Sequence, residues 1–178
     1  MIIGISSIVL HKEGGLASKD ASFLLRISQF ISRYELTVST CILLVEDSPT
    51  DAAILVAAFE SIGYKGTIEV AKSGIEATDI LGTIENTAEQ VWPKLILLDL
   101  NLPRRSGLEV LDDIKTNPSW MSIPTIVLSS SSSQTDIINS YKRHANAYIS
   151  KPRQLDHYET VARQLYGFWI ETVQSPLH

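Results

Sequence analysis

The sequence predicts an α/β protein with a doubly wound, five-stranded parallel sheet and helices on both faces. From residue 41 onward, short apolar, β-branched runs alternate with helical patterns five times. Strands joined by single helices form βαβ crossovers in a mostly parallel sheet. Three of the apolar runs contain almost no polar residue, which is typical of strands buried on both faces.

The expected strands are 42–45, 67–70, 95–98, 125–128 and 147–149. Glu69 lies within the second of these runs and favours an edge position for it. The expected helices cover about 50–62, 74–82, 107–116, 134–144 and 154–172. Pro49, directly after Ser48, suits the first turn of a helix with an acceptor side chain before it. Gly63 stands where a left-handed helix cap is common.

The first forty residues differ from this pattern. A Gly-rich break at 11–18 precedes 20–35, where apolar residues recur at three- and four-residue steps and predict an amphipathic helix. We therefore expect an N-terminal extension at 1–40, one domain at 41–173 and a short tail at 174–178.

Composition limits the classes of partner. The net charge of −5 argues against a broad nucleic-acid surface, which needs a basic patch. Cys41 is the only cysteine, so neither an internal disulfide nor a Cys-rich zinc site is expected. Residues 1–10 are apolar, but they lack a basic flank and are too short to cross a bilayer. We expect a cytoplasmic protein without membrane or nucleic-acid partners.

Chemically capable residues follow four of the five expected strands. Glu46 and Asp47 follow the first strand, Asp99 the third, Ser129 the fourth and Lys151 the fifth. Each alone has an ordinary structural explanation, because chains turn polar as they leave the core. Lys151-Pro152 could be a solvated turn, and the serine run 129–133 a flexible loop. Together they are more specific, because the carboxyl ends of parallel strands meet at one edge of the sheet.

This set of groups suits phosphoryl transfer. Carboxylate oxygens with room for water favour Mg2+, and an aspartate can act as a nucleophile and become an aspartyl phosphate. Such a transfer requires in-line positioning and neutralisation of charge on the phosphoryl oxygens. A lysine ammonium and a hydroxyl contribute to that neutralisation.

Four segments carry a resemblance to a known family: ILLVEDSPTD (42–51), LILLDLNLPRRSGLEVL (95–111), IPTIVLSSSS (123–132) and AYISKP (147–152). In this order and spacing, the chain resembles the receiver domains of two-component response regulators from about Cys41 to Trp169. The resemblance implies the flavodoxin-like strand order 2-1-3-4-5. It also implies a signalling domain that catalyses only its own phosphorylation and dephosphorylation.

The resemblance assigns a role to each matching residue of the metal site. Asp99 is the expected phosphoacceptor and a metal ligand. Asp47 is expected to bind Mg2+ directly, and Glu46 through water. Asn101 is expected to contribute its backbone carbonyl to the metal and its side chain to the phosphoryl group.

Further roles concern the response to phosphorylation. Ser129 stands at the switch position that hydrogen-bonds the phosphoryl group, and Lys151 is expected to pair with another of its oxygens. Tyr148 matches the aromatic switch, whose ring turns inward on activation. Gly107 matches the glycine that closes the loop after the acceptor, and the Lys151–Pro152 bond is expected to be cis. The chain departs from the common pattern at 104–106 (RRS), at Ser130 and at Glu46, without loss of the core chemistry.

A finer resemblance concerns the amino-acid sequences of the loops and the C-terminal tail. The segments PKLILLDLNLP (93–103), TIENTAEQVWPK (83–94) and FWIETVQSP (168–176) look like the small regulators partnered with cyanobacterial phytochromes. This implies a phytochrome-type sensor histidine kinase as partner. The last helix carries an apolar stripe at Leu155, Tyr158, Ala162, Leu165 and Trp169, with more apolar residues beside it. We expect a homodimer through the fifth strand and this helix, tightened by phosphorylation.

Three other functions fit these residues less well. A haloacid-dehalogenase-type hydrolase would need a second acid where this chain has Asn101. A flavodoxin-like FMN protein would use 129–135 as its phosphate loop, but such a loop usually follows the first strand, where Glu46 and Asp47 would repel phosphate. A non-phosphorylated interaction module would not need the intact acidic pair, aspartate and lysine.

Overall fold

The computed structural model describes residues 41–87 and 91–174. The helix expected at 20–35 lies outside the described residues. The strands are β1 (Cys41–Val45), β2 (Thr67–Ala71), β3 (Leu95–Leu98), β4 (Thr125–Ser129) and β5 (Ala147–Ser150). The helices are α2 (Pro49–Ser61), α3 (Gly74–Glu85), α4 (Gly107–Thr116), α5 (Gln134–Lys142), α6 (Asp156–Leu165) and the π-helical turn η1 (Tyr166–Thr172).

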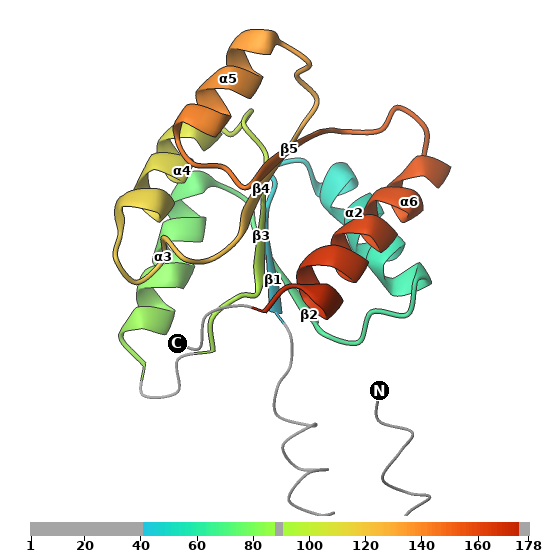
Figure 1. Ribbon diagram of the computed structural model, residues 1–178, viewed down its shortest axis with the longest axis horizontal. Helices are drawn as coiled ribbons and strands as arrows, with labels where there is room; N and C mark the ends of the chain where they lie inside the picture. The colour runs from blue at the N-terminus through green and yellow to red at the C-terminus, as the bar shows by residue number, and fades with distance from the viewer. Residues whose placement is uncertain (1–40, 88–90, 175–178) are drawn as a thin grey trace, which may run out of the picture. The chain divides into compact units, whose positions relative to one another are not determined.

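The five strands form one parallel sheet in the order β2-β1-β3-β4-β5, as expected. Figure 1 shows the sheet edge-on, with α2 and α6 against one face and α3, α4 and α5 against the other. The edge position predicted for 67–70 is confirmed. Within the described residues, no helix is long and apolar enough to cross a membrane.

Alternate residues of the strands build two cores, one on each face of the sheet. In β1, Ile42 and Leu44 pack into the α2–α6 side, whereas Leu43 and Val45 pack into the α3–α4–α5 side. This follows from the strand geometry, because successive side chains point to opposite faces. The central strands β1, β3 and β4 are therefore buried along almost their whole length, as the sequence pattern predicted.

The ends of α2 match the sequence signals. Ser48 caps the helix, its Oγ accepting a hydrogen bond from the Asp51 backbone N–H at 3.3 Å, and Pro49 occupies the first helical position. Gly63 has a φ of +85°, the left-handed conformation that glycine adopts without steric cost. Both helix-end predictions are confirmed.

One prediction about the C-terminal segment is wrong, and another holds with a change of helix type. The helix expected at 154–172 begins at Asp156 and changes to a π-helical turn at Tyr166. Leu155 was expected in the buried stripe, but it precedes the first turn and is 67% exposed. Tyr158, Ala162 and Leu165 do form the buried face.

Candidate functional site

The strand register brings the predicted residues to one edge of the sheet. Val45 pairs with Leu98, and the Asp99 backbone N–H donates to the Val45 carbonyl at 3.0 Å. The Lys151 backbone N–H likewise donates to the carbonyl of Ser129 at 2.8 Å. Because β1, β3, β4 and β5 end at matching levels, the residues that follow them meet.

Lys151 occupies the centre of this group. Its Nζ donates to Glu46 Oε2 at 2.7 Å, to Asp99 Oδ2 at 2.7 Å and to Asp51 Oδ2 at 2.9 Å. The Lys151 side chain is only 6% exposed, so the alternative of a solvated turn residue is wrong. The three ammonium hydrogens are matched by three carboxylates, and such charge-assisted bonds are the strong ones.

Asp51 was not singled out from the sequence. It occupies the first turn of α2, where an acid is common for reasons of helix stability alone. The available signal was its spacing, since a residue in the first turn of the helix after β1 lies at the same edge of the sheet as Glu46.

Three carboxylates form a candidate metal site. Oxygen atoms of Glu46, Asp47 and Asp99 lie within 4.8 Å of one another. Glu46 and Asp99 are buried, whereas Asp47 is exposed to solvent. With Asp51, the site holds four carboxylates, three of which share the Lys151 ammonium, and this excess of negative charge on oxygen donors fits a hard divalent cation.

Burial and ion pairing shift the pKa values of Glu46 and Lys151 in opposite directions. Burial raises the pKa of Glu46, and the hydrogen bond from Lys151 only partly opposes it. For Lys151, burial by itself lowers the pKa, but the hydrogen bonds to Asp99, Glu46 and Asp51 outweigh it, so the pKa lies above its usual range. Lys151 therefore stays charged at neutral pH.

The loop after β3 holds Asn101 beside the aspartate. The Asn101 backbone N–H donates to Asp99 Oδ1 at 3.2 Å, and its Nδ2 donates to Ser130 Oγ at 3.2 Å. Gly107 closes this loop, its N–H donating to the Leu100 carbonyl at 2.9 Å. A Cβ at Gly107 would overlap the backbone carbonyl of Asp99, so only glycine allows this close approach.

The serine run after β4 is a hydrogen-bonded loop. Ser129 is fully buried, and its Oγ accepts from the Ser131 backbone N–H at 3.3 Å. The Ser131 carbonyl accepts from Tyr148 Oη at 2.8 Å, and its Oγ donates to Asp136 at 2.6 Å. Burial raises the pKa of Tyr148, whose ring packs against the core on the α3–α4–α5 side. This loop thus connects Ser129 to Tyr148.

One local expectation is wrong: the Lys151–Pro152 bond is trans. The two isomers before a proline differ intrinsically by only about 0.5–1 kcal/mol, so the local sequence does not decide between them.

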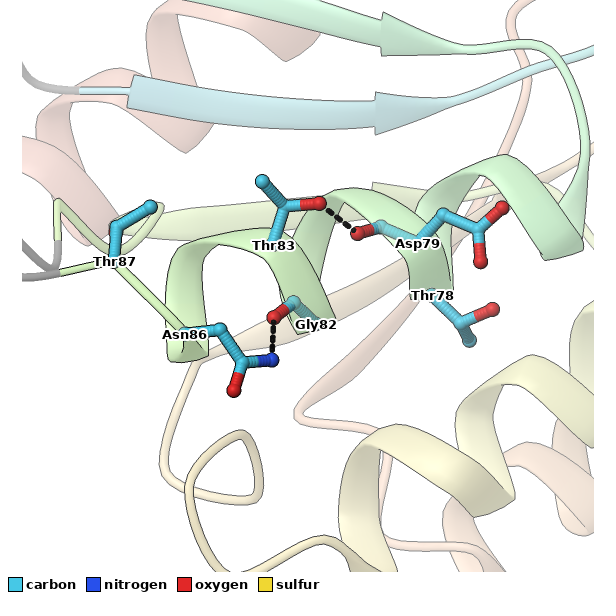
Figure 2. A pocket seen from close by; sticks show the side chains of 6 residues that line it. All are labelled: Thr78, Asp79, Gly82, Thr83, Asn86 and Thr87. Atoms are coloured by element: carbon cyan, nitrogen blue, oxygen red, sulfur yellow. Dashed lines mark hydrogen bonds between the residues drawn. The ribbon is translucent and has the colours of Figure 1, made fainter.

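A hollow lies away from these residues, along α3. Its lining includes Thr78, Asp79, Gly82, Thr83 and Asn86 around about 590 Å³ of open space (Figure 2). Most of its polar side chains bond back to their own helix, as when Thr83 Oγ1 donates to the Asp79 carbonyl and Asn86 Nδ2 to that of Gly82. These groups are occupied by the helix, so the acidic edge remains the candidate site.

Comparison with known proteins agrees with this geometry. Residues 42–163 match the family model of the response regulator receiver domain. The response regulator Rcp1 of Synechocystis sp. is 38% identical over 138 residues, which cover 76% of this chain and 92% of Rcp1.

Solved structures of response regulators also resemble this chain. The Mn2+-bound form of Rcp1 has a TM-score of 0.69 at 37% identity, covering 78% of this chain and 99% of that chain. The phosphorylated cyanobacterial phytochrome response regulator RcpA has a TM-score of 0.71 at 36% identity, with the same coverage of both chains. With most of its length matched by the family model and by these relatives, the chain belongs to the response regulator receiver domains of two-component signalling.

Proposed function

We propose that Asp99 is the phosphoacceptor of this receiver domain and takes its phosphoryl group from a sensor histidine kinase. The observation that carries the proposal is the placement of Asp99. Its carboxylate is 4% exposed, bonded to the Lys151 ammonium at 2.7 Å, and within the same group of acids as Glu46 and Asp47.

The transfer requires little of the protein beyond positioning and charge. An Asp99 carboxylate oxygen attacks the phosphorus of the kinase phosphohistidine in line, and the phosphorus–nitrogen bond breaks with its electron pair going to the imidazole. The Lys151 ammonium and the Ser129 hydroxyl donate to the phosphoryl oxygens, and the side-chain amide of Asn101 lies beside them. Phosphorylation draws the Ser129 hydroxyl from the Ser131 N–H, which loosens the loop that holds Tyr148.

The metal proposed for the site is Mg2+. The carboxylates of Asp47 and Asp99, the backbone carbonyl of Asn101 and, through water, Glu46 would hold it. When bound, the cation supplies positive charge that offsets the negative charge of the carboxylates and the phosphoryl oxygens. The Mn2+-bound structure of the similar protein Rcp1 supports a divalent ion here.

The partner proposed is a phytochrome-type histidine kinase in the cytoplasm. This rests on similarity to phytochrome response regulators of cyanobacteria and other sources, such as RcpA and AtBRR. We further propose one receiver domain at 41–173, with self-association through β5 and α6. Exposed Leu155, directly before α6, and exposed Phe168, within η1, support a contact surface there.

Acetyl phosphate with Mg2+ tests the proposal directly. Intact-mass spectrometry is expected to show one added phosphoryl group on the wild type and none on Asp99→Asn. Asp79→Asn, which alters an exposed acid on α3, is the matched control and is expected to label normally. Labelling of Asp99→Asn at the wild-type rate would overturn the assignment.

A further inference from the structure

Asp51 is the carboxylate that the site chemistry described above leaves without a role. It contacts the Lys151 ammonium at 2.9 Å, yet it is not part of the group formed by Glu46, Asp47 and Asp99. Its side chain is 34% exposed, whereas those of Glu46 and Asp99 are almost fully buried. Asp51 thus approaches Lys151 from the solvent side of the site.

The local structure of α2 leaves this carboxylate available. In α4, Glu109 occupies the same third helical position and accepts from the Ser106 backbone N–H at 2.8 Å, which completes a capping box. In α2, the corresponding Ser48 N–H instead donates to Glu46 Oε1 at 3.3 Å. Asp51 is therefore not needed to cap its own helix, and its carboxylate faces Lys151.

Metal binding would change the partners of the lysine. Glu46 and Asp99 are the two other acceptors of Lys151, and both belong to the proposed metal site. A divalent cation competes with the ammonium for these carboxylates, because each oxygen has a limited number of lone pairs directed into the site. Asp51 is outside the group that would hold the metal, so its bond to Lys151 would face no such competition.

We propose that Asp51 is a positioning residue: it retains the Lys151 ammonium at the site while Glu46 and Asp99 engage the metal and the phosphoryl group. This inference rests on the proposed function. A lysine has a flexible stem and a strongly hydrated head, so without Asp51 the ammonium leaves for solvent once its other partners are engaged.

The first experiment measures where Lys151 lies. Protein in saturating Mg2+ is treated with an amine-reactive acylating reagent, and modification of Lys151 is quantified by peptide mass spectrometry. We expect Asp51→Ala to raise the modification rate of Lys151 by roughly tenfold, as the ammonium is no longer held in the protein. Glu76→Ala, which removes the acid at the same position of α3, is expected to leave that rate unchanged.

The second experiment measures how the loss of Asp51 changes the rate of phosphorylation. Asp51→Ala is expected to slow phosphorylation by acetyl phosphate about three- to tenfold, since small displacements of a charge-neutralising group cost rate. In a Lys151→Ala background the same substitution is expected to have no further effect, because Asp51 acts through the lysine. Asp51→Asn, which keeps an acceptor but not the charge, is expected to fall between wild type and Asp51→Ala in both experiments.

Equal protection of Lys151 in wild type and Asp51→Ala would overturn the inference, as would independent, multiplying effects of the two substitutions on rate. Failure of the proposed function has a different signature. In that case the wild type does not label at Asp99, while the modification of Lys151 in Mg2+ still reports whether Asp51 holds the ammonium.

Discussion

At the scale of single residues, the dominant feature is an excess of negative charge. Glu46, Asp51 and Asp99 share one cation, Lys151, and Asp47 lies beside Glu46 and Asp99. Like charges at such short distances destabilise one another, most of all where solvent is excluded. The folded site therefore carries a cost that a divalent cation relieves, which couples metal binding to stability.

Asp47→Ala tests this coupling. Asp47 is exposed and is not bonded to Lys151, so its loss should leave the fold intact while removing a proposed direct ligand. We expect Mg2+ affinity to fall by about 10- to 100-fold, measured by titration calorimetry. Asp79→Ala serves as the control, and an unchanged affinity in Asp47→Ala would exclude Asp47 as a ligand.

Gly107→Ala tests the close approach of the loop to Asp99. The added Cβ would collide with the Asp99 and Leu100 backbone, so we expect a loss of about 1–3 kcal/mol in the free energy of unfolding. Gly82→Ala is the control, because a Cβ there meets nothing within 4 Å and an alanine in a helix interior should gain about 0.5–1 kcal/mol. Equal urea midpoints for the two variants would contradict the prediction.

At the scale of elements, two helices end in the same way with different residues. After α2, Tyr64 N–H donates to the Phe59 carbonyl at 3.1 Å, around Gly63 at φ +85°. After α5, Ala145 N–H donates to the Ser140 carbonyl at 3.0 Å, around His144 at φ +63°. Both are Schellman motifs. His144, however, adopts the left-handed backbone conformation, which is unfavourable for any residue that carries a Cβ.

This difference predicts opposite effects of two substitutions. His144→Gly should stabilise the protein by about 0.5–1 kcal/mol, because it relieves the left-handed strain at an exposed position. Gly63→Ala should destabilise it by roughly 1 kcal/mol, purely through the backbone, since no atom lies within 4 Å of the new Cβ. Urea denaturation of both variants measures the two changes, and a common sign would refute the interpretation.

At the scale of the whole domain, the C-terminal segment from Leu155 through η1 presents one buried and one exposed set of apolar residues. Tyr158, Ala162 and Leu165 cover the sheet beside α2, whereas Leu155 and Phe168 remain more than half exposed. Large exposed apolar side chains can mark a contact surface. Tyr148 lies on β5 and is linked through Ser131 to the site, so an interface at β5 and α6 would sense phosphorylation.

Self-association is therefore expected to depend on phosphorylation. Multi-angle light scattering over a dilution series should show a dimer that persists to lower concentration after treatment with acetyl phosphate and Mg2+. Phe168→Ser should weaken that dimer, and Met121→Ser, at an exposed apolar residue before β4, is the control. A monomer at every concentration, phosphorylated or not, would contradict a dimer through this surface.

The sequence by itself determined the strands and the meeting of their ends. Continuous apolar runs such as 95–98 require burial on both faces, and βαβ connections make the strands parallel. Residues following β1, β3, β4 and β5 must then gather at one edge, which is why the sequence alone predicts that Glu46, Asp99 and Lys151 lie together. The cap at Ser48 and the turn at Gly63 depend on local preferences of single residues, so the sequence predicts them as well.

Only the tertiary structure decided which of these groups touch. Lys151 and Asp51 are 100 positions apart, and their contact depends on how α2 packs against the sheet rather than on any local pattern. The exposure of Leu155 and the binding of Tyr148 to the Ser131 carbonyl likewise depend on where neighbouring segments lie. Periodicity and chain connectivity are properties of short segments, whereas the partner of a polar side chain is set by distances that only the folded chain defines.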